Sequence, residues 1–216
     1  CEKYRKYLID YKKNFCILHL YFSSILMYEL FLDAVSTRGK MLLLRDGKSI
    51  GEEVIELAWN ESSKLWAKVF SFLESCKVDV SEIWRIYVVR GPGSFTGIRS
   101  ICLFCNTLAY IFPSLELCPL SFFDLYESYP IIKQSSRRDV FVKMQKNATI
   151  EILPITELKN LLVWYREVWW SFDVALLERE NLFLHQDYSI TEVLSRYTWH
   201  SSRCVEPLYM KAPNIY

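Results

Sequence analysis

The sequence predicts an α/β fold made of two similar lobes, and three observations lead to this prediction. Strand-like and helix-like stretches follow the order β-β-β-α-β-α up to about residue 112, and a second mixed set comes after them. Asp46-Gly47 stands between two strand-like stretches, which is a strong hairpin signal. A glycine-rich turn joins a β-branched strand directly to a helix. We expect the lobes to meet within residues 113–130, with 27–120 in the first lobe and 121–216 in the second.

Local patterns predict the elements of the first lobe. Tyr28–Asp33 (YELFLD) and residues 41–45 (MLLLR) have the apolar character of buried strands. In residues 61–76, apolar side chains recur every three or four positions, as on one face of a helix. The complete prediction is strands at Tyr28–Asp33, 41–45, 50–57 and 85–89, and helices at 61–76 and 94–112, the last ended by Pro113.

Patterns in the second half of the chain are weaker. Residues 131–133 and 140–144 flank a polar turn and resemble a hairpin, and Ser189 is a suitable N-cap for a short helix. The prediction for this half is strands at 131–133, 140–144, 149–153 and 172–177, and helices at 155–162 and 189–197. No internal sequence repeat is evident.

Composition excludes two classes of protein. Among the 216 residues, 51% are hydrophobic, which is too high a share for a disordered chain. The formal net charge is only +1, so the chain lacks the positive charge of a protein that grips nucleic acid alone. If a nucleic acid is involved, we expect a partner to supply most of that charge.

The first 26 residues differ from the rest. They carry five Lys or Arg residues and two acidic residues, and an apolar stretch follows at 15–27. That stretch contains His19, Ser23 and Ser24 and is shorter than the roughly 18 apolar residues that suggest a membrane span. We expect no membrane association, and we expect Met27 to be the natural start, with 1–26 outside the native protein.

Cysteines and histidines give no support for a metal or catalytic site. Seven cysteines and three histidines are scattered along the chain. Cys102 and Cys105 form a C-x-x-C pair, but the pair lies in an apolar helical stretch without a second Cys/His pair at ligand spacing. We therefore expect reduced thiols in a cytoplasmic protein, no metal ligands and no catalytic residues.

The most informative segment is GPGSFTGIR, residues 91–99. Its glycines permit a sharp turn after a strand, and Ser94 can cap the helix that begins there. Gly97 lowers helix propensity, which indicates that a ligand or another helix packs against the backbone. Free amides at such a helix start could bind a phosphate, but the spacing fits neither the Walker A nor the dinucleotide pattern. Both interpretations, a nucleotide site and helix packing, remain open from the residues alone.

GPGSFTGIR after the strand RIYVV resembles the signature of the TsaB (YeaZ) family. The opening segment YELFLDAVSTRGKMLLLRDGK resembles the first hairpin of that family, with Asp33 and Ser36 at its aspartate and serine/threonine positions. The closing segment EPLYMKAP, residues 206–213, also fits the family pattern. The likeness covers residues 28–125 and the last dozen well, and residues 130–200 only loosely. The sequence departs from the family pattern at Asn60-Glu61-Ser62-Ser63 and at 134–141, which puts inherited ligand contacts there in doubt.

This resemblance implies an actin-like (ASKHA, ribonuclease H-like) fold with a reduced second lobe, and a scaffold without catalytic activity. Its partners would be a TsaD-like subunit, which carries the metal and the active site, and a TsaE-like ATPase. Together they attach a threonylcarbamoyl group to adenosine in tRNA, so this chain would meet tRNA only through the complex. When alone, the chain could form a homodimer.

The resemblance also directs attention to the two helices at 61–76 and 94–112 as the partner surface. One apolar stripe must face the sheet, and a second would be left for the partner. The predicted interface residues are Trp66, Phe70, Ser94, Phe95, Thr96, Gly97, Ile98, Arg99 and Phe104.

Two alternatives come from other classes of protein. An ATP-binding protein would use Asp33, Gly91, Gly93 and Ser94 near the phosphates, whereas a glycoprotease-like enzyme would need a nucleophile or metal set that the spacing does not support. For the scaffold we expect no tightly bound cofactor, with ATP or ADP allowed at the interface of the complex.

Glycine is scarce and tryptophan abundant, at six and seven residues. Trp84 is expected between a helix and a strand, and Trp169 and Trp170 directly before a strand, where glycine would suit a turn. An open hypothesis is that UGA codons at these positions are read as glycine in the source organism.

Overall fold

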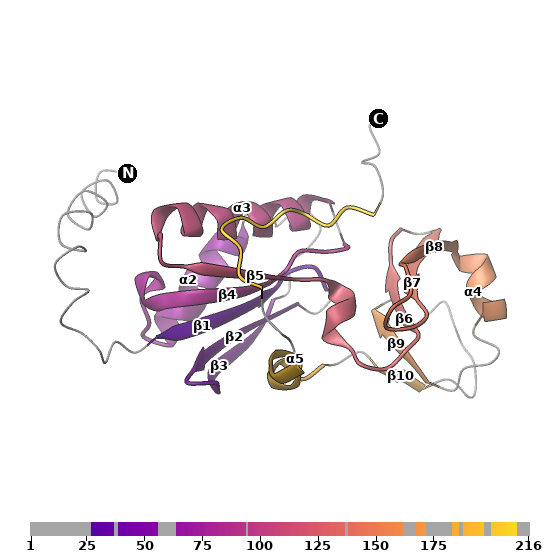
Figure 1. Cartoon of the computed structure of the whole chain (residues 1–216), viewed down its shortest axis with the longest axis horizontal. Coiled ribbons are helices and arrows are strands. Elements are labelled where there is room, and N and C mark those ends of the chain that lie inside the picture. The colour runs from indigo at the N-terminus through magenta and orange to yellow at the C-terminus, as the bar shows by residue number, and fades with distance from the viewer. Residues whose placement is uncertain are drawn as a thin grey trace.

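The residues that the structure describes form two five-stranded mixed sheets, which lie side by side in Figure 1. The computed structural model describes residues 27–36, 39–55, 64–93, 95–136, 138–161, 167–171, 183–185, 188–196 and 200–210. Within these residues, no helix is both long enough and apolar enough to span a lipid bilayer.

The first sheet has the strand order β3-β2-β1-β4-β5. Its strands are β1 (Tyr28–Asp33), β2 (Gly39–Arg45), β3 (Lys48–Ile55), β4 (Ile83–Val89) and β5 (Glu116–Leu120). β1, β2 and β3 are antiparallel neighbours, whereas β4 and β5 continue the sheet in parallel from β1. At the tight turn between β2 and β3, Asp46 and Gly47 have φ values of 52° and 73°. These positive values explain the Asp-Gly pair, because both central residues of a type I′ turn need them.

Both faces of the first sheet are buried. Helices α2 (Leu65–Ser75) and α3 (Phe95–Ile111) connect the parallel strands and lie on one face, as Figure 1 shows. Leu30 and Leu32 of β1 pack in the core beneath these helices. The alternate residue, Phe31, points to the opposite face and belongs to a second core cluster.

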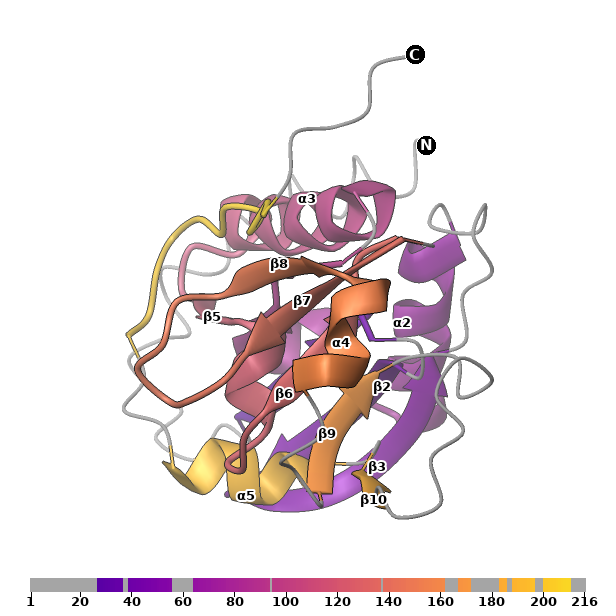
Figure 2. The same cartoon turned by 90° about the vertical axis from the view of Figure 1, so that its right-hand side faces the viewer.

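The second sheet repeats the arrangement of the first. Its order is β10-β9-β6-β7-β8, so its first strand is again central, with an antiparallel pair on one side and parallel strands on the other. The strands are β6 (Ile131–Gln134), β7 (Asp139–Lys143), β8 (Glu151–Pro154), β9 (Glu167–Ser171) and β10 (Phe183–His185). Figures 1 and 2 place α4 (Ile155–Leu161) on the face turned away from the first sheet. The prediction of an α/β fold with two similar lobes is confirmed.

The chain passes from the first lobe to the second through the segment that follows β5. Two short 3-10 helices, η2 (Val80–Glu82) and η3 (Phe122–Leu125), precede β4 and follow β5 respectively. η3 leads toward the second sheet and packs, with α5 (Ile190–Arg196), in the second core cluster. As predicted, Ser189 precedes α5 directly, and its hydroxyl accepts a hydrogen bond from the N–H of Glu192 (3.4 Å). Residues 202–210, called the C-terminal strap below, return to the first lobe and run along α3 (Figure 1).

The tryptophan positions correct one prediction. Trp84 lies within β4, not before it, at a point where the pairing with β1 shifts by one residue. Trp169 and Trp170 lie inside β9. None of the three occupies a turn that would call for glycine, so the structural premise of the UGA hypothesis is wrong. The strand predicted at 172–177 lies outside the described residues, and β5, β9 and β10 were not predicted.

Candidate functional site: a closed strand-end junction and an exposed helical face

The ends of β1 and β4 meet a residue of β6 at one place, called the strand-end junction below. Asp33, the last residue of β1, has an exposed fraction of 0%. One of its carboxylate oxygens accepts hydrogen bonds from the N–H groups of Val35 (2.9 Å) and Ser36 (3.0 Å). The other accepts one from the hydroxyl of Tyr188 (2.7 Å). The carboxylate is therefore bonded on both oxygens by the chain itself.

Lys133 brings a second buried charge to this junction. Its ammonium donates to the carbonyl oxygen of Val35 (3.0 Å) and lies 4.0 Å from the centre of the Phe122 ring. Burial lowers the pKa of Lys133 to about 8, although the charge of the nearby Asp33 acts in the opposite direction. The lysine thus links β6 of the second sheet to the turn that follows β1 of the first.

The glycines after β4 are explained by close packing of the chain on itself. A Cβ added to Gly93 would lie 2.3 Å from Cγ1 of Val35. Gly91 has a φ of +127°, and its Cβ would lie 2.7 Å from the carbonyl oxygen of Leu208. Only glycine can adopt this φ readily and also fit beside Leu208, because it has no Cβ. The carbonyl of Gly91 also accepts from the N–H of Phe122 (2.7 Å).

These contacts bear on the predicted nucleotide residues. The structure does bring Asp33 and Gly93 together, through Val35, which touches both. Both Asp33 oxygens, however, are occupied by internal donors, and the side of Gly93 where a side chain would sit faces Val35. Ser94 lies outside the described residues. In the described part of the chain, no group of three or more His, Cys, Asp or Glu residues could hold a metal ion.

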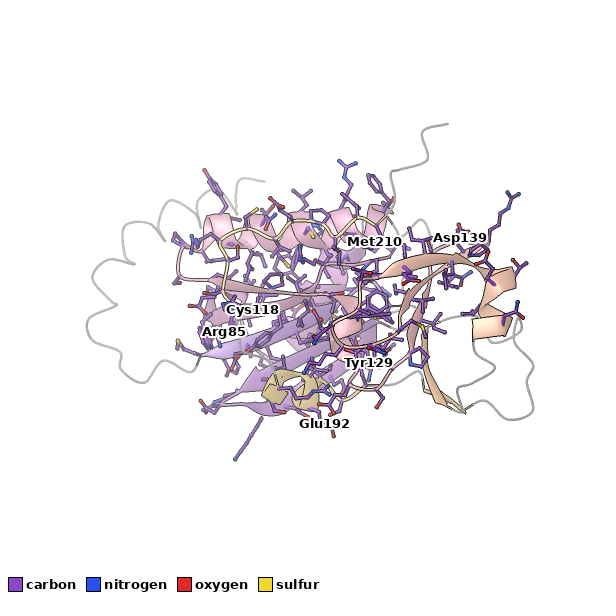
Figure 3. All side chains as sticks on the ribbon, turned by 45° about the vertical axis from the view of Figure 1, so that its right-hand side comes forward. Arg85, Cys118, Tyr129, Asp139, Glu192 and Met210 are labelled. Atoms are coloured by element: carbon purple, nitrogen blue, oxygen red, sulfur yellow. The ribbon has the colours of Figure 1, made fainter. Side chains whose placement is uncertain are left out.

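A second polar cluster lies on the opposite face of the first sheet from the helices, where Figure 3 labels Arg85 and Cys118. The guanidinium of Arg85 donates to Glu116 from two nitrogens (3.1 and 2.7 Å). The hydroxyl of Tyr87 donates a hydrogen bond to the carboxylate of Glu29, and burial raises the pKa of Tyr87. Each charge here is matched by a neighbour, which is typical of a cluster that stabilises the sheet.

Helices α2 and α3 present an exposed apolar surface, called the α2–α3 face below. Leu103 and Tyr110 on α3 have exposed fractions of 63% and 88%. Phe70 on α2 and Phe95 at the start of α3 are exposed as well. Exposed apolar clusters of this kind mark interaction surfaces more often than isolated exposed residues do. The face is defined by Phe70, Phe95, Arg99, Leu103 and Tyr110.

Two of the predicted interface residues lie in the interior of the first lobe. Phe104 has an exposed fraction of 0% and Ile98 of 1%. The ring of Phe104 lies between the two helices, where the ring of Trp66 meets it edge-on at 4.7 Å and that of Phe70 at 6.1 Å. Trp66 itself is only partly exposed. Phe104 therefore fills the groove between α2 and α3 and is not available to a partner.

The other predicted interface residues on α3 lie in the first turns of the helix. Phe95, Thr96 and Arg99 are exposed and Gly97 is half-buried. Sequence reasoning missed Leu103 and Tyr110. Their signal was present, because they are seven residues apart, which is two helical turns, and lie off the buried stripe formed by Ile98, Ile101, Cys105 and Leu108.

The C-terminal strap is fixed along α3 by polar contacts. The side-chain amide of Asn106 both donates to the carbonyl of Val205 (3.0 Å) and accepts from its N–H (2.8 Å). Arg203 donates to main-chain carbonyls around the end of α3. The N–H of Leu208 donates to the carbonyl of Arg90 (2.9 Å), beside the turn at Gly91–Gly93, called the glycine turn below.

The strap extends the α2–α3 face by one aromatic residue. The rings of Tyr209 and Phe95 are stacked, with centroids 4.7 Å apart and planes at 26°. The guanidinium of Arg99 lies 5.4 Å from the Phe95 ring centre. Met210, labelled in Figure 3, packs against the second core cluster. The strap thus connects the exposed first turns of α3 to the region between the sheets.

No family model matches the chain. Over 68 residues the chain is 35% identical to the tRNA threonylcarbamoyladenosine biosynthesis protein TsaB of Bacillus subtilis (strain 168). The match spans 32% of this chain and only 30% of the length of that protein.

Two solved structures from Pseudomonas aeruginosa are similar in fold. One is an uncharacterized protein with similarity to peptidase YEAZ, with a TM-score of 0.64 and 17% identity over 86% of this chain and 100% of that chain. The other is YeaZ, with a TM-score of 0.56 and 20% identity over 78% of this chain and 89% of that chain. At these identities the likeness establishes the mixed α/β fold.

Proposed function

We propose that this chain is a member of the TsaB (YeaZ) family and a non-catalytic subunit of the machinery that forms threonylcarbamoyladenosine in tRNA. In this role it binds a TsaD-like catalytic subunit through the α2–α3 face. The observation that carries the proposal is the exposure of Leu103 and Tyr110, together with Phe95, on a helix whose opposite apolar stripe is buried.

The composition of the face supports a protein partner. Aromatic side chains and arginine are enriched where protein interfaces are most stabilising, and the face carries three aromatic rings and Arg99. The stacked pair of Phe95 and Tyr209 adds a rigid apolar surface that loses little conformational entropy on binding.

The strand-end junction supports a scaffold role rather than catalysis. Asp33 and Lys133 are both buried and their polar groups bond to the chain itself. We therefore propose that no cofactor binds tightly to this chain alone, and that any ATP or ADP lies at the interface of the complex. A TsaE-like ATPase and the tRNA meet this chain through the complex, in the cytoplasm.

The proposal is tested by measuring the affinity of the full chain for the TsaD-like subunit of the same organism. Leu103→Asp places a charge at the centre of the face, and Tyr110→Ala removes its most exposed ring. Each is expected to weaken the complex about tenfold or more, in line with about 1–2 kcal/mol for an interface anchor. The matched control is Ile152→Asp on β8, an exposed apolar residue outside the face.

The functional readout is threonylcarbamoylation of tRNA by the purified subunits with and without this chain. We expect modification to require the chain and to fall with Leu103→Asp but not with Ile152→Asp. Equal modification in its absence, or tight ATP binding by the isolated chain, would contradict the scaffold assignment.

A further inference from the structure

Lys133 is the buried cation that connects the second sheet to the first lobe. It lies on β6, where it pairs with Phe141 of β7 and Ser171 of β9, and its exposed fraction is 3%. Its hydrogen bond to the carbonyl of Val35 crosses from one sheet to the turn after β1 of the other. A buried lysine in this position loses hydration, so its contacts must hold it in a defined place.

Val35, which accepts the hydrogen bond from Lys133, also packs against the glycine turn. The Val35 side chain lies so close to Gly93 that any Cβ there would overlap it. Gly93 stands two residues before Phe95, the first residue of α3. Valine is stiff at χ1, so a shift of its main chain moves its methyl groups with it. The path from Lys133 to Gly93 therefore consists of one hydrogen bond and one close packing contact, and Gly93 precedes α3 in the chain.

We propose that Lys133 is a positioning residue for partner binding, which holds the Val35 turn against Gly93 and thereby fixes the first turn of α3, where Phe95 and Arg99 face the partner. This inference rests on the proposed function, because it assigns a consequence for the affinity of the TsaD-like subunit. It goes beyond that function by giving the second lobe a part in shaping a surface that lies wholly on the first lobe and the strap.

The groups that face Lys133 define how its charge acts. The carboxylate of Asp33 approaches it from the end of β1, the carbonyl of Val35 accepts its hydrogen bond, and the ring of Phe122 lies on the η3 side. The hydroxyl of Tyr188 donates a hydrogen bond to one oxygen of the Asp33 carboxylate. The ammonium of Lys40 donates to the main-chain carbonyl of Tyr188 (3.2 Å).

Loss of the Lys133 proton changes two of these contacts. Burial lowers the pKa of Lys133 to about 8. Above that pH its hydrogen bond to Val35 is no longer charge-assisted, which makes it weaker, and its attraction to Asp33 is lost.

The first test compares affinities of full-length variants for the TsaD-like subunit. Lys133→Met keeps the length of the side chain but removes its donor and charge, and we expect affinity to fall at least fivefold. The control Lys143→Met removes a lysine from the neighbouring strand β7 and should bind within twofold of wild type. Because Lys133→Met leaves the buried Asp33 without its cation, the double variant Asp33→Asn/Lys133→Met removes both charges and is expected to bind as weakly as the single variant.

The second test is spectroscopic and uses the isolated chain. The amide resonances of Val35, Gly93 and Phe95 should titrate with a midpoint near pH 8 in the wild type and lose that transition in Lys133→Met. Affinity for the partner should decrease across the same transition in the wild type and not in the variant. If Lys133 were merely structural, its substitution would lower stability, but the resonances of these amides would not follow the titration of the lysine.

The outcomes separate the two proposals. If the wild-type chain does not bind the TsaD-like subunit, the proposed function fails. If the wild type binds but Lys133→Met, or the double variant, binds equally well, the inference about Lys133 is wrong and the proposed function stands. A titration of the three amides without a change in affinity would also overturn it.

Discussion

The hydroxyl of Tyr188 donates a 2.7 Å hydrogen bond to the carboxylate of Asp33, which lies 155 residues earlier in the chain. This bond joins the segment before α5 to the end of β1. The ring of Tyr188 also packs against Phe31 and Tyr126, at 6.2 and 5.7 Å between centroids. One tyrosine thus combines apolar packing with the satisfaction of a buried charge.

Tyr188→Phe tests the value of that hydroxyl. The change keeps the ring but leaves one oxygen of a buried carboxylate without a donor, which costs about 1–3 kcal/mol. We expect urea unfolding at pH 7 to show a loss of stability in that range. Tyr209→Phe, which removes a hydroxyl from an exposed ring, should leave the midpoint unchanged. Equal midpoints for both variants would mean that water or another group bonds to Asp33 in place of Tyr188.

Gly93→Ala tests the close contact between the glycine turn and Val35. The added Cβ would overlap Val35, and overpacking of this kind costs about 1–3 kcal/mol. The double variant Gly93→Ala/Val35→Ala removes the overlapping methyl groups and should recover most of that loss. Thermal unfolding followed by circular dichroism measures both. Failure of the second change to restore stability would show that the strain lies elsewhere in the turn.

Phe104→Ala distinguishes the interior side of α3 from its exposed side. Because Phe104 is fully buried between α2 and α3, its removal leaves a cavity and should cost about 3–5 kcal/mol. Phe70→Ala removes a ring of the same size that is 41% exposed, so a clearly smaller loss is expected. Guanidinium unfolding of the two variants gives the comparison. Similar losses would contradict the assignment of Phe104 to the core.

Alkylation of cysteines tests burial through the pKa of the thiols. Burial raises the pKa of Cys102 and of Cys118 to about 11, and it raises that of Cys105 as well. Only the thiolate reacts, so at pH 8 these three groups are almost entirely in the unreactive thiol form. Cys204 on the strap is exposed and should react with iodoacetamide much faster. Mass spectrometry of peptides after brief labelling, with urea-unfolded protein as the control, gives the four rates.

Local signals predicted the parts of the fold that depend on neighbouring residues. Asp46-Gly47 fixes its turn because both residues adopt positive φ, and Ser189 caps α5 three residues before the N–H it binds. β5 was missed because Pro119 argues against a strand. Proline is tolerated there because β5 is the edge of its sheet.

Contacts between residues that are far apart in the sequence could not be predicted from local signals. The periodicity of α3 places Leu103 and Tyr110 off its buried stripe, but it does not say that α2 covers Phe104. The meeting of Asp33, Lys133 and Tyr188 depends on how the two sheets pack, which no local pattern records. The order of elements predicted two similar lobes, but it did not give the order of the strands within each sheet, because that order depends on pairing between distant segments.

The anchoring of the C-terminal strap constrains when the first lobe can mature during synthesis. Ser202 pairs with Leu117 of the edge strand β5, and Val205 is a buried member of the core beneath α3. The first lobe therefore needs residues 202–205, which follow the whole second sheet in the sequence, to complete its core. Translation must pass residue 208, which closes over the glycine turn, before that lobe attains its final packing, so a nascent chain halted earlier would expose an incomplete core to chaperones and proteases.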